Sequence, residues 1–444
     1  MIYCKVVCII VDAYSTGKNI APIIKAQGYP CIHIKSSNSL PSRYQHNESD
    51  FILSLTYTGS IESIIERLTP YKVRLCIPGY ESGVELADLL CEFLSLQGND
   101  RHHSLMRRNK YIMNEAVASA GLKTVRHCQS DSLSTLINWV KDVNHYPIVA
   151  KPFDSANGDG VFFCDNDAEL ENAFNSIINT ANQFGVKNKQ VLVESLNRGN
   201  EYIINTVSWE RNHFVAEIWR VTRRLYTTIY DKAEIVTMDE EEWQPLIDYT
   251  FQVLDALHIH YGAATTEVKY TKDTGATLLE TSARLMGNSP VAFSHQLAGY
   301  TQLSLLIEAY LFNADFMERF KRKKMPSKLH GMIVVLISEK EGIIHRKFRE
   351  VFHHLKTLHS YNIEDEPGTT ICKTTNSLTA PGEIYLMGSK EAIEKDYLEI
   401  RRIESTLYQE ATKSVLGSLT HNAFLSKVEN SSSELSQELD ETLI

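Results

Sequence analysis

Two glutamates lie at mirrored positions in a stretch that has the pattern of a β-hairpin. The segments GAATTEVKY and ATLLETS are joined by the turn sequence TKDTG. If the hairpin is symmetric about residues 273–274, Glu267 lies opposite Glu280 and Val268 lies opposite Leu279. Carboxylates opposed at about 5 Å destabilise a strand pair, so we expect a raised pKa or a bound cation. The pattern predicts a site for a hard divalent ion, above all Mg²⁺. The alternative is a register shifted by one residue, with one glutamate in solvent.

A lysine followed by a glycine-containing loop is the second candidate feature, in VAKPFDSANGDGV. Lys151 ends an apolar run and is followed by small, flexible residues from Ser155 to Gly160, with Gly158 among them. Such a loop can present backbone N–H groups and an ammonium group to phosphates. The string matches neither the P-loop nor the dinucleotide-binding motif, and a plain surface hairpin would have the same composition.

A third feature is a pair of glutamates in VLVESLNRGNEY. Glu194 ends an apolar strand, and Glu201, seven residues later, begins the next strand. The connecting segment could offer backbone groups to the edge of an adenine ring, and Glu201 could bind ribose hydroxyls. The alternative is two glutamates in a solvated loop.

The first hundred residues alternate strand and helix patterns. An apolar run at 5–11 precedes an amphipathic stretch at 16–27, and the strands CIHIK and KVRLCI are followed by the helical pattern GVELADLLCEFL. This order is typical of βαβ units and predicts a doubly wound parallel sheet. Glu81 follows Pro78 at the carboxyl edge of this sheet, where such folds bind ligands. There it could bind a substrate ammonium group or lie in solvent, and residues 12–17 form a second such edge.

The later sequence predicts α+β architecture. Helices and short strands give way from residue 190 to antiparallel strands, and from residue 411 the polar sequence cannot bury enough apolar surface to become ordered. The predicted divisions are an N-terminal α/β lobe at 1–103, a central lobe with a phosphate-covering loop at 104–189, a C-terminal lobe with the metal site at 190–325, a C-terminal subdomain at 326–410 and a flexible tail at 411–444.

Composition restricts the partners and the compartment. At about 150 residues per domain, 444 residues suggest about three domains or lobes. A net charge of -10 gives no basic footprint for nucleic acid or an anionic membrane. No run approaches the ~18 apolar residues of a membrane span, and Asp12 interrupts the opening run where a signal peptide would still be apolar. We therefore expect a cytoplasmic protein that acts on small molecules.

The order and spacing of these residues resemble the pattern of the ATP-grasp superfamily, over about residues 3–405. Within that superfamily the chain looks most like the carboxylate–amine ligases of the L-amino-acid ligase type. The closer resemblance rests on the strings IPGYESGVELAD, RRNKY and LLETSARLMGNSP. The residues that carry the wider pattern are Lys110, Lys151 with its glycine loop, Glu194, Glu201, Glu267, Glu280 and Arg284.

This resemblance implies an ATP-grasp fold that combines α/β and α+β parts. A doubly wound parallel-sheet lobe would be followed by a small central lobe and a larger antiparallel-sheet C-terminal lobe. It also implies that Lys110 and Lys151 contact nucleotide phosphates under the loop at 155–160. Glu194 and the backbone after it would meet adenine, and Glu201 would meet ribose.

The resemblance further implies that Glu267 and Glu280 hold Mg²⁺, with Mn²⁺ as an alternative. It also implies that Arg284 faces the reacting carboxyl and phosphoryl groups. Two positions depart from the superfamily. Ser282 stands where Asn is usual, two residues after the second acid, which leaves the number of metal ions open. The pair at 286–287 is Met-Gly instead of the common Gly-Gly, and this change would narrow the pocket for the second substrate.

The implied reaction joins a carboxylate to an amine through an acyl phosphate, at the expense of ATP. The substrates would be amino acids or similar small molecules, and Arg284 could give two N–H donors to the tetrahedral oxyanion. The base that accepts the amine proton is open, with His258, His260 and His295 as candidates by position only. Rival interpretations are a non-catalytic nucleotide-binding or regulatory protein, and another ATP-grasp activity such as carboxylation or modification of a protein carboxylate. The sequence leaves the oligomeric state open.

Overall fold

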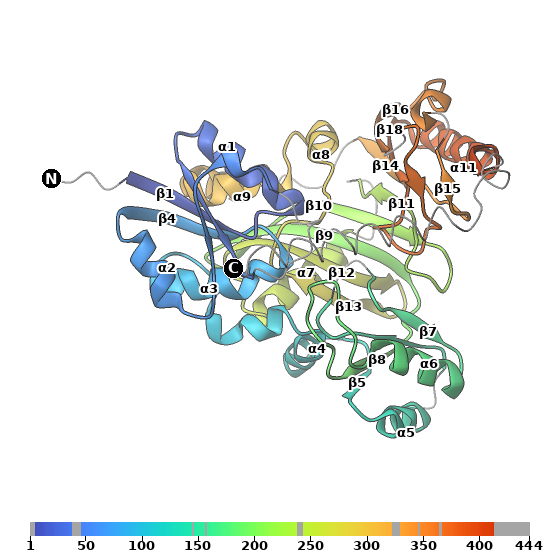
Figure 1. The fold of residues 1–444 in the computed structure, drawn as a ribbon, viewed down its shortest axis with the longest axis horizontal. Coiled ribbons are helices and arrows are strands. Elements are labelled where there is room, and N and C mark those ends of the chain that lie inside the picture. Colours follow the sequence, from blue (N-terminus) through green and yellow to red (C-terminus); the bar gives the residue numbers. More distant parts are fainter. Residues whose placement is uncertain are drawn as a thin grey trace, which may run out of the picture.

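The structure is a computed structural model that describes residues 5–37, 46–143, 146–155, 158–237, 243–321, 329–344, 347–363 and 366–412. It combines a parallel-sheet lobe, a small central lobe and a large antiparallel sheet, as predicted (Figure 1). Of the tail predicted from residue 411, residues 413–444 lie outside the described part. None of the described helices has the length and apolar character that crossing a membrane requires.

The N-terminal lobe is a parallel sheet with helices on both faces, which confirms the doubly wound prediction. Its strands run in the order β3-β2-β1-β4, and each neighbouring pair is parallel. Ile10 of β1 packs with α1, whereas Ile9 packs with α2 and α3, so β1 is apolar along its length because both of its faces are buried. The elements are β1 (Lys5–Val11), α1 (Ile20–Ala26), β2 (Cys31–Lys35), β3 (Phe51–Thr56), α2 (Ile61–Leu68), β4 (Tyr71–Pro78) and α3 (Val84–Phe93).

Two glycine backbones meet at the carboxyl edge of this sheet. A methyl group on Gly17 would lie 2.1 Å from the carbonyl oxygen of Gly79, so no larger residue fits there unless the backbone moves. The backbone N–H of Gly79 also donates to the carbonyl oxygen of Val11 at 2.7 Å. These contacts fix the segment that leaves β4 and leads to Glu81.

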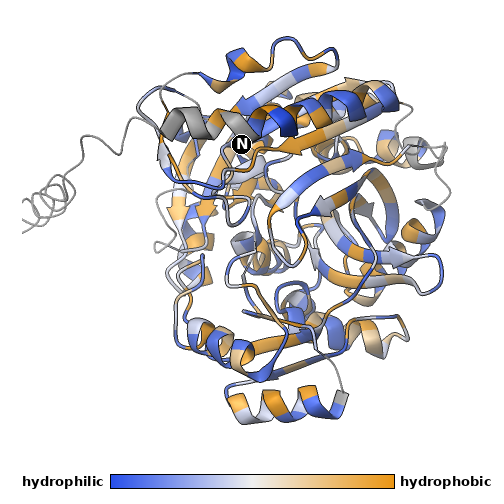
Figure 2. Cartoon of the chain, turned by 90° about the vertical axis from the view of Figure 1, so that its right-hand side faces the viewer, coloured by the Kyte–Doolittle hydropathy of each residue, from blue (hydrophilic) through white to orange (hydrophobic). Residues whose placement is uncertain are grey.

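The central lobe is a four-stranded antiparallel sheet in the order β5-β8-β6-β7, covered by α5 and α6. In Figure 2, α5 at the bottom carries hydrophobic and hydrophilic residues on different sides, as expected for a helix with one buried face. The domain boundaries stay predictions, but the pairing of β8 with β5 and β6 favours a boundary after Ser195. The elements are α4 (Lys110–Ser119), β5 (His127–Ser130), α5 (Leu133–Val143), β6 (Ile148–Lys151), β7 (Phe162–Cys164), α6 (Asp167–Ile177) and β8 (Val191–Ser195).

The third sheet has eight strands in the order β13-β12-β9-β10-β11-β14-β18-β16, and every pair is antiparallel. The strands of the predicted C-terminal subdomain therefore continue the sheet that carries the glutamate pair. Its strands are β9 (Asn200–Trp209), β10 (Asn212–Arg223), β11 (Tyr230–Ile235), β12 (Gly262–Thr271), β13 (Gly275–Ser282), β14 (His330–Val335), β16 (Leu358–Ile363) and β18 (Gly382–Gly388). The remaining elements are α7 (Trp243–Ala256), α8 (Val291–Ala298), α9 (Gln302–Leu311), α10 (Asn313–Lys321), α11 (Lys390–Thr412) and the short pair β15 (Gly342–Ile343) and β17 (Thr370–Ile371).

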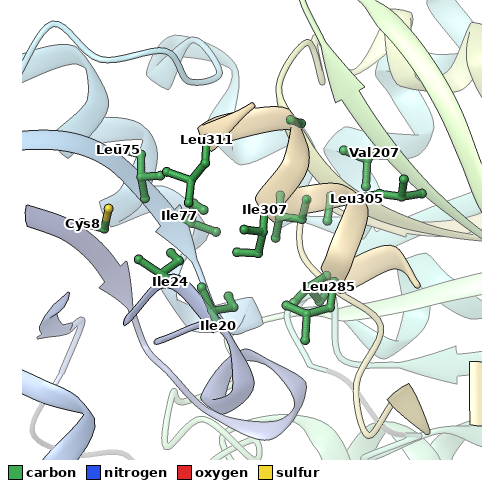
Figure 3. Packing of buried hydrophobic residues seen from close by; sticks show 14 of the residues in the cluster. Cys8, Ile20, Ile24, Leu75, Ile77, Val207, Leu285, Leu305, Ile307 and Leu311 are labelled. Carbon is green, nitrogen blue, oxygen red and sulfur yellow. The ribbon is translucent and has the colours of Figure 1, made fainter. Parts of the chain in front are cut away.

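Helix α9 joins the first lobe to the large sheet. Its residues Leu305 and Ile307 belong to one buried cluster with Ile24 and Ile77 of the first lobe and Val207 of β9 (Figure 3). Fully burying an aliphatic side chain contributes about 1.5–3 kcal/mol. This shared core holds the carboxyl edge of the parallel sheet beside β12 and β13.

Candidate active site

The predicted glutamate pair exists: Glu267 on β12 lies directly opposite Glu280 on β13. The prediction was wrong at the next position, where Val268 pairs with Leu278 rather than Leu279. The loop between β12 and β13 has three residues, whereas the predicted symmetric turn has an even number. This loop alone would shift every strand pair by one residue. A bulge beside Glu267 shifts the pairing back, so the glutamates meet.

The two carboxylates have different electrostatic surroundings. Burial and the nearby charge of Glu280 raise the pKa of Glu267 to about 7, although Arg223, at 3.8 Å, opposes this. Burial would also raise the pKa of Glu280, but the charges of Lys110 and Lys151 bring it below the usual value. The negative charge of Glu280 is thus balanced by two lysines of the protein, whereas the negative charge of Glu267 is balanced poorly.

Lys110 is placed by the start of α4. The side chain of Asn109 caps this helix by accepting from two backbone N–H groups, at 3.0 and 3.2 Å. The Lys110 ammonium lies 3.0 Å from Glu280 and donates to the carbonyl oxygen of Ser155 at 2.5 Å. This lysine therefore connects the glutamate pair to the loop that was predicted to cover phosphates.

Lys151 ends β6 and faces the neighbouring strand β8. Its ammonium lies 2.7 Å from Oε2 of Glu194, and both side chains are largely buried. Oε1 of Glu194 is buried without a hydrogen-bond partner among the described residues. The structure therefore pairs the residue predicted to meet phosphates with the residue predicted to meet adenine.

The loop between β6 and β7 contains the predicted phosphate-covering residues. Gly158 and Gly160 have φ angles of 73° and 65°, which glycine adopts readily. A methyl group on either glycine would lie 2.9 Å from a neighbouring side chain. The Ser155 hydroxyl donates to Asp159 at 2.7 Å, which closes the loop on itself, and residues 156–157 lie outside the described part.

Glu201, predicted to meet ribose, lies at the start of β9 between two cations. One of its oxygens is 2.7 Å from Arg223 and the other is 3.0 Å from Lys269. Burial alone would raise the pKa of Glu201, but these two charges bring it below the usual value. Arg223 also reaches Glu267, so it connects this glutamate to the predicted metal site.

Arg284 and Glu81 meet although they are 203 residues apart in the chain. Arg284 Nε donates to one oxygen of Glu81 at 3.0 Å, and Arg108 donates to the other at 2.8 Å. Burial would raise the pKa of Glu81, but these two guanidinium groups lower it to about 2. Arg284 Nη1 donates to Leu285, and its Nη2 donates to no described residue. That nitrogen is available to a ligand.

Part of this network borders a pocket with an empty volume, open solvent included, of about 250 Å³, whereas the predicted residues Lys151, Glu194, Glu201, Glu267 and Arg284 are not among its lining residues. Of the predicted residues, Glu81, Lys110, Ser155 and Glu280 line it. The candidate bases His258, His260 and His295 are not among its lining residues. The full lining consists of Glu81, Arg107, Arg108, Lys110, Met113, Ser155, Glu280, Thr281 and Ser282.

Two arginines of this site were missed by the sequence reasoning. Arg108 stands next to Arg107 in the string RRNKY, and both are charged residues before a helix. Both border the pocket, and only the fold separates their charge partners, because Arg107 is fully buried against Asp88 whereas Arg108 pairs with Glu81 and Asp154. Arg223 ends a strand with a second arginine beside it, and no local pattern marks it.

Comparison with known proteins agrees with this geometry. The ATP-grasp domain family matches residues 144–292, a range that contains Lys151 and the glutamate pair. Dapdiamide A synthase from Enterobacter agglomerans is 30% identical over 413 residues, which cover 91% of this chain and 97% of that protein. A similarity of this extent includes all three sheets.

Solved structures show the same fold. The L-amino acid ligase from Bacillus licheniformis matches with a TM-score of 0.70 at 17% identity, over 90% of this chain and 97% of that chain. Phosphoribosylglycinamide synthetase from Anaerococcus prevotii matches with a TM-score of 0.61 at 17% identity, over 89% of this chain and 97% of that chain. The chain therefore belongs to the ATP-grasp superfamily and, within it, to the ATP-dependent carboxylate–amine ligases.

Proposed function

We propose that this ligase joins two amino acids, or an amino acid and another small carboxylate, through an acyl phosphate formed with ATP. Its similarity to dapdiamide A synthase and its fold likeness to an L-amino acid ligase support this substrate class. The observation that carries the proposal is Arg284, whose Nη2 is available to a ligand and whose charge reaches Glu267. An arginine in that position can stabilise a carboxyl group that gains negative charge.

The proposed reaction has two steps. The substrate carboxylate attacks the γ-phosphorus of ATP, and ADP leaves with the electrons of the broken P–O bond. The amine of the second substrate then attacks the acyl carbon, inorganic phosphate leaves and the amine loses a proton. Lys110 and Lys151 would bind phosphate oxygens, and Arg284 would bind the oxygen that becomes the oxyanion. The residues at 155–160 would exclude water from the acyl phosphate.

The nucleoside would lie between the central lobe and the large sheet. We infer that Glu194 and the backbone after it bind adenine and that Glu201 binds the ribose hydroxyls. Glu201 already has a fixed orientation because Arg223 and Lys269 hold its two oxygens. The unpartnered oxygen of Glu194 is available to a donor group.

The glutamate pair fits a divalent cation. Glu267 and Glu280 are opposed carboxylates, and burial together with the charge of Glu280 raises the pKa of Glu267, so a cation beside the pair would favour its ionised form. Bound there, Mg²⁺ would neutralise phosphate charge during transfer. No group of three or more His, Cys, Asp or Glu is arranged as a metal site within the described ranges. We infer that these two glutamates, with Ser282 as a weaker neighbour, supply the protein ligands, and Mn²⁺ would suit the same oxygens.

The partners and the location follow from the proposed chemistry. Amino acids and other small carboxylates and amines are the expected partners, and a cytoplasmic location, where ATP is abundant, stays a prediction. Nucleic acid and membranes are not expected partners because the chain carries a net charge of -10.

A panel of single and paired amino acids tests the proposal. With Mg²⁺ and ATP, we expect release of ADP and phosphate, and a ligated product by mass spectrometry, only when both partners are present. A non-catalytic nucleotide-binding protein would give no turnover with any pair. ADP release that depends on bicarbonate and yields a carboxylated product would instead establish carboxylation.

Lys151 provides a separate test of the nucleotide site. Lys151→Ala should weaken ATP binding about tenfold or more in titration calorimetry and leave adenosine binding almost unchanged, because only ATP presents charge to the ammonium. Lys141→Ala is the matched control, since Lys141 lies on α5 of the same lobe and is 64% exposed.

Removal of Lys151 also leaves Glu194 without its 2.7 Å partner, so a second variant is needed. The double variant Lys151→Ala/Glu194→Gln removes both charges of the pair and keeps the site neutral. Because Glu194 is itself assigned to adenine, the double variant is compared with Glu194→Gln alone. If the added Lys151→Ala exchange lowers ATP and adenosine binding equally, Lys151 is structural and its assignment to phosphates is wrong.

A further inference from the structure

Arg108 lies in the active site but has no role in the pattern carried over from the superfamily. Its side chain is only 8% exposed, and it lines the same pocket as Lys110 and Glu280. The preceding Arg107 also borders this pocket, but its side chain is fully buried and held in a 2.8 Å ion pair with Asp88. Arg108 is therefore the arginine of this pair that can meet a ligand.

Two arginines share one carboxylate at this place. Glu81 gives one oxygen to Arg108 at 2.8 Å and the other to Arg284 at 3.0 Å. One carboxylate can neutralise only one of the two guanidinium groups. The second negative charge comes from Asp154, whose Oδ1 lies 2.8 Å from Nη2 of Arg108.

Asp154 differs from Glu81 in its position and its exposure. It lies on the loop between β6 and β7, immediately before Ser155, and its backbone oxygen accepts from Asn182. Its side chain is 26% exposed, against 8% for Glu81. Moving Asp154 into water therefore costs less than exposing or stranding Glu81. The carboxylate of Asp154 is the one that another anion can replace.

We propose that Arg108 is a second anion-binding residue of the active site, and that Asp154 holds its guanidinium until a phosphoryl oxygen takes that place. The guanidinium offers paired N–H donors that match phosphoryl oxygens. The γ-phosphate of ATP, the acyl phosphate and inorganic phosphate share this chemistry. The arrival of such a group at this position in catalysis rests on the proposed function.

The competing explanation is a simple latch, in which Asp154 and Arg108 only hold the loop to the segment that precedes α4. The two explanations predict opposite changes in anion affinity when Asp154 is removed. If the ion pair is a latch, removing either partner loosens the loop and weakens anion binding. If Asp154 competes with the anion, removing Asp154 strengthens anion binding whereas removing Arg108 weakens it.

The test is a calorimetric titration of the full chain with inorganic phosphate in the presence of ADP and Mg²⁺. Asp154→Asn should tighten phosphate binding several-fold, and Arg108→Gln should weaken it about tenfold or more. Arg108→Lys, which keeps the charge but loses the planar donors, should fall between Arg108→Gln and the unmodified protein. Glu85→Gln is the matched control, because Glu85 lies 3.7 Å from the same guanidinium but is 52% exposed on α3. It should change the affinity less than twofold.

Three results would overturn the proposal. Weaker phosphate binding in Asp154→Asn would establish the latch, and unchanged binding in Arg108→Gln would show that Arg108 binds no anion. If Glu85→Gln tightened phosphate binding as much as Asp154→Asn, the effect would come from the loss of any negative charge near Arg108 and not from Asp154 in particular. Failure of the proposed function gives a different result. The unmodified protein would then release no ADP with any amino-acid pair, whereas Asp154→Asn and Arg108→Gln would still change the phosphate affinity in opposite directions.

Discussion

Glu280→Gln should reduce ADP release to the background of the assay at every Mg²⁺ concentration, while the protein remains folded. The carboxylate faces Glu267 across the hairpin and lies 3.0 Å from Lys110, so in the proposed site it would hold the cation and orient the lysine assigned to phosphates. A neutral amide is a much weaker ligand for a hard cation than a carboxylate. The fold should persist because removal of one of two opposed carboxylates relieves their repulsion. Coupled ADP release with the best amino-acid pair, measured across a Mg²⁺ titration, gives the result.

Glu234→Gln is the matched control for this variant. Glu234 lies on β11 of the same sheet, is 23% exposed and pairs with Lys232 at 3.5 Å, so the chemical change and the burial are similar. Its turnover should stay close to that of the unmodified protein. An unchanged turnover number for Glu280→Gln at saturating Mg²⁺ would end the assignment of Glu280 as a metal ligand.

Arg284→Lys should bind ATP almost normally and lose about a hundredfold or more in kcat, the usual loss when an oxyanion donor is removed. The structure fixes the guanidinium through Glu81 and Leu285, which leaves Nη2 for the substrate. Lysine keeps the charge but cannot hold Glu81 and donate to the substrate in the same plane. The two measurements are coupled ADP release and nucleotide affinity on the same preparation.

The control for Arg284 is Arg220→Lys. Arg220 contacts Tyr202, which packs against α7 on the opposite face of the large sheet, so this exchange should leave kcat unchanged. If Arg284→Lys lost ATP affinity in proportion to its rate, Arg284 would be a nucleotide ligand. If it lost neither, the role carried over from the superfamily would not apply at this position.

The order of elements could be predicted because it depends on short-range patterns. The apolar strand at residues 5–11, the amphipathic helices and the turn glycines each specify local structure by the spacing of apolar residues and by backbone freedom. The cap of α4 by Asn109 is equally local. The parallel lobe and the large antiparallel sheet follow from the sequence of such elements.

The register of the hairpin shows where local reasoning reaches its limit. The meeting of Glu267 and Glu280 was predicted, but from a symmetric turn that does not exist. A three-residue loop and a bulge shift the pairing in opposite directions, and the glutamates meet because the two shifts cancel. The sequence placed the two acids on neighbouring strands, whereas the exact partner depended on a backbone irregularity without a sequence signal.

The amino-acid sequence by itself determined which residue types stand near which strand ends, and hence the superfamily, the carboxylate pair and the two lysines. Only the tertiary structure decided which charges meet. Arg284 and Glu81 come together over 203 residues, and Arg108 rather than Arg107 pairs with Glu81. These choices depend on how α9 and the shared core hold the first lobe against the large sheet. Contacts between distant elements follow from packing and from the cost of burying charge, and neither is written in the spacing of neighbouring residues.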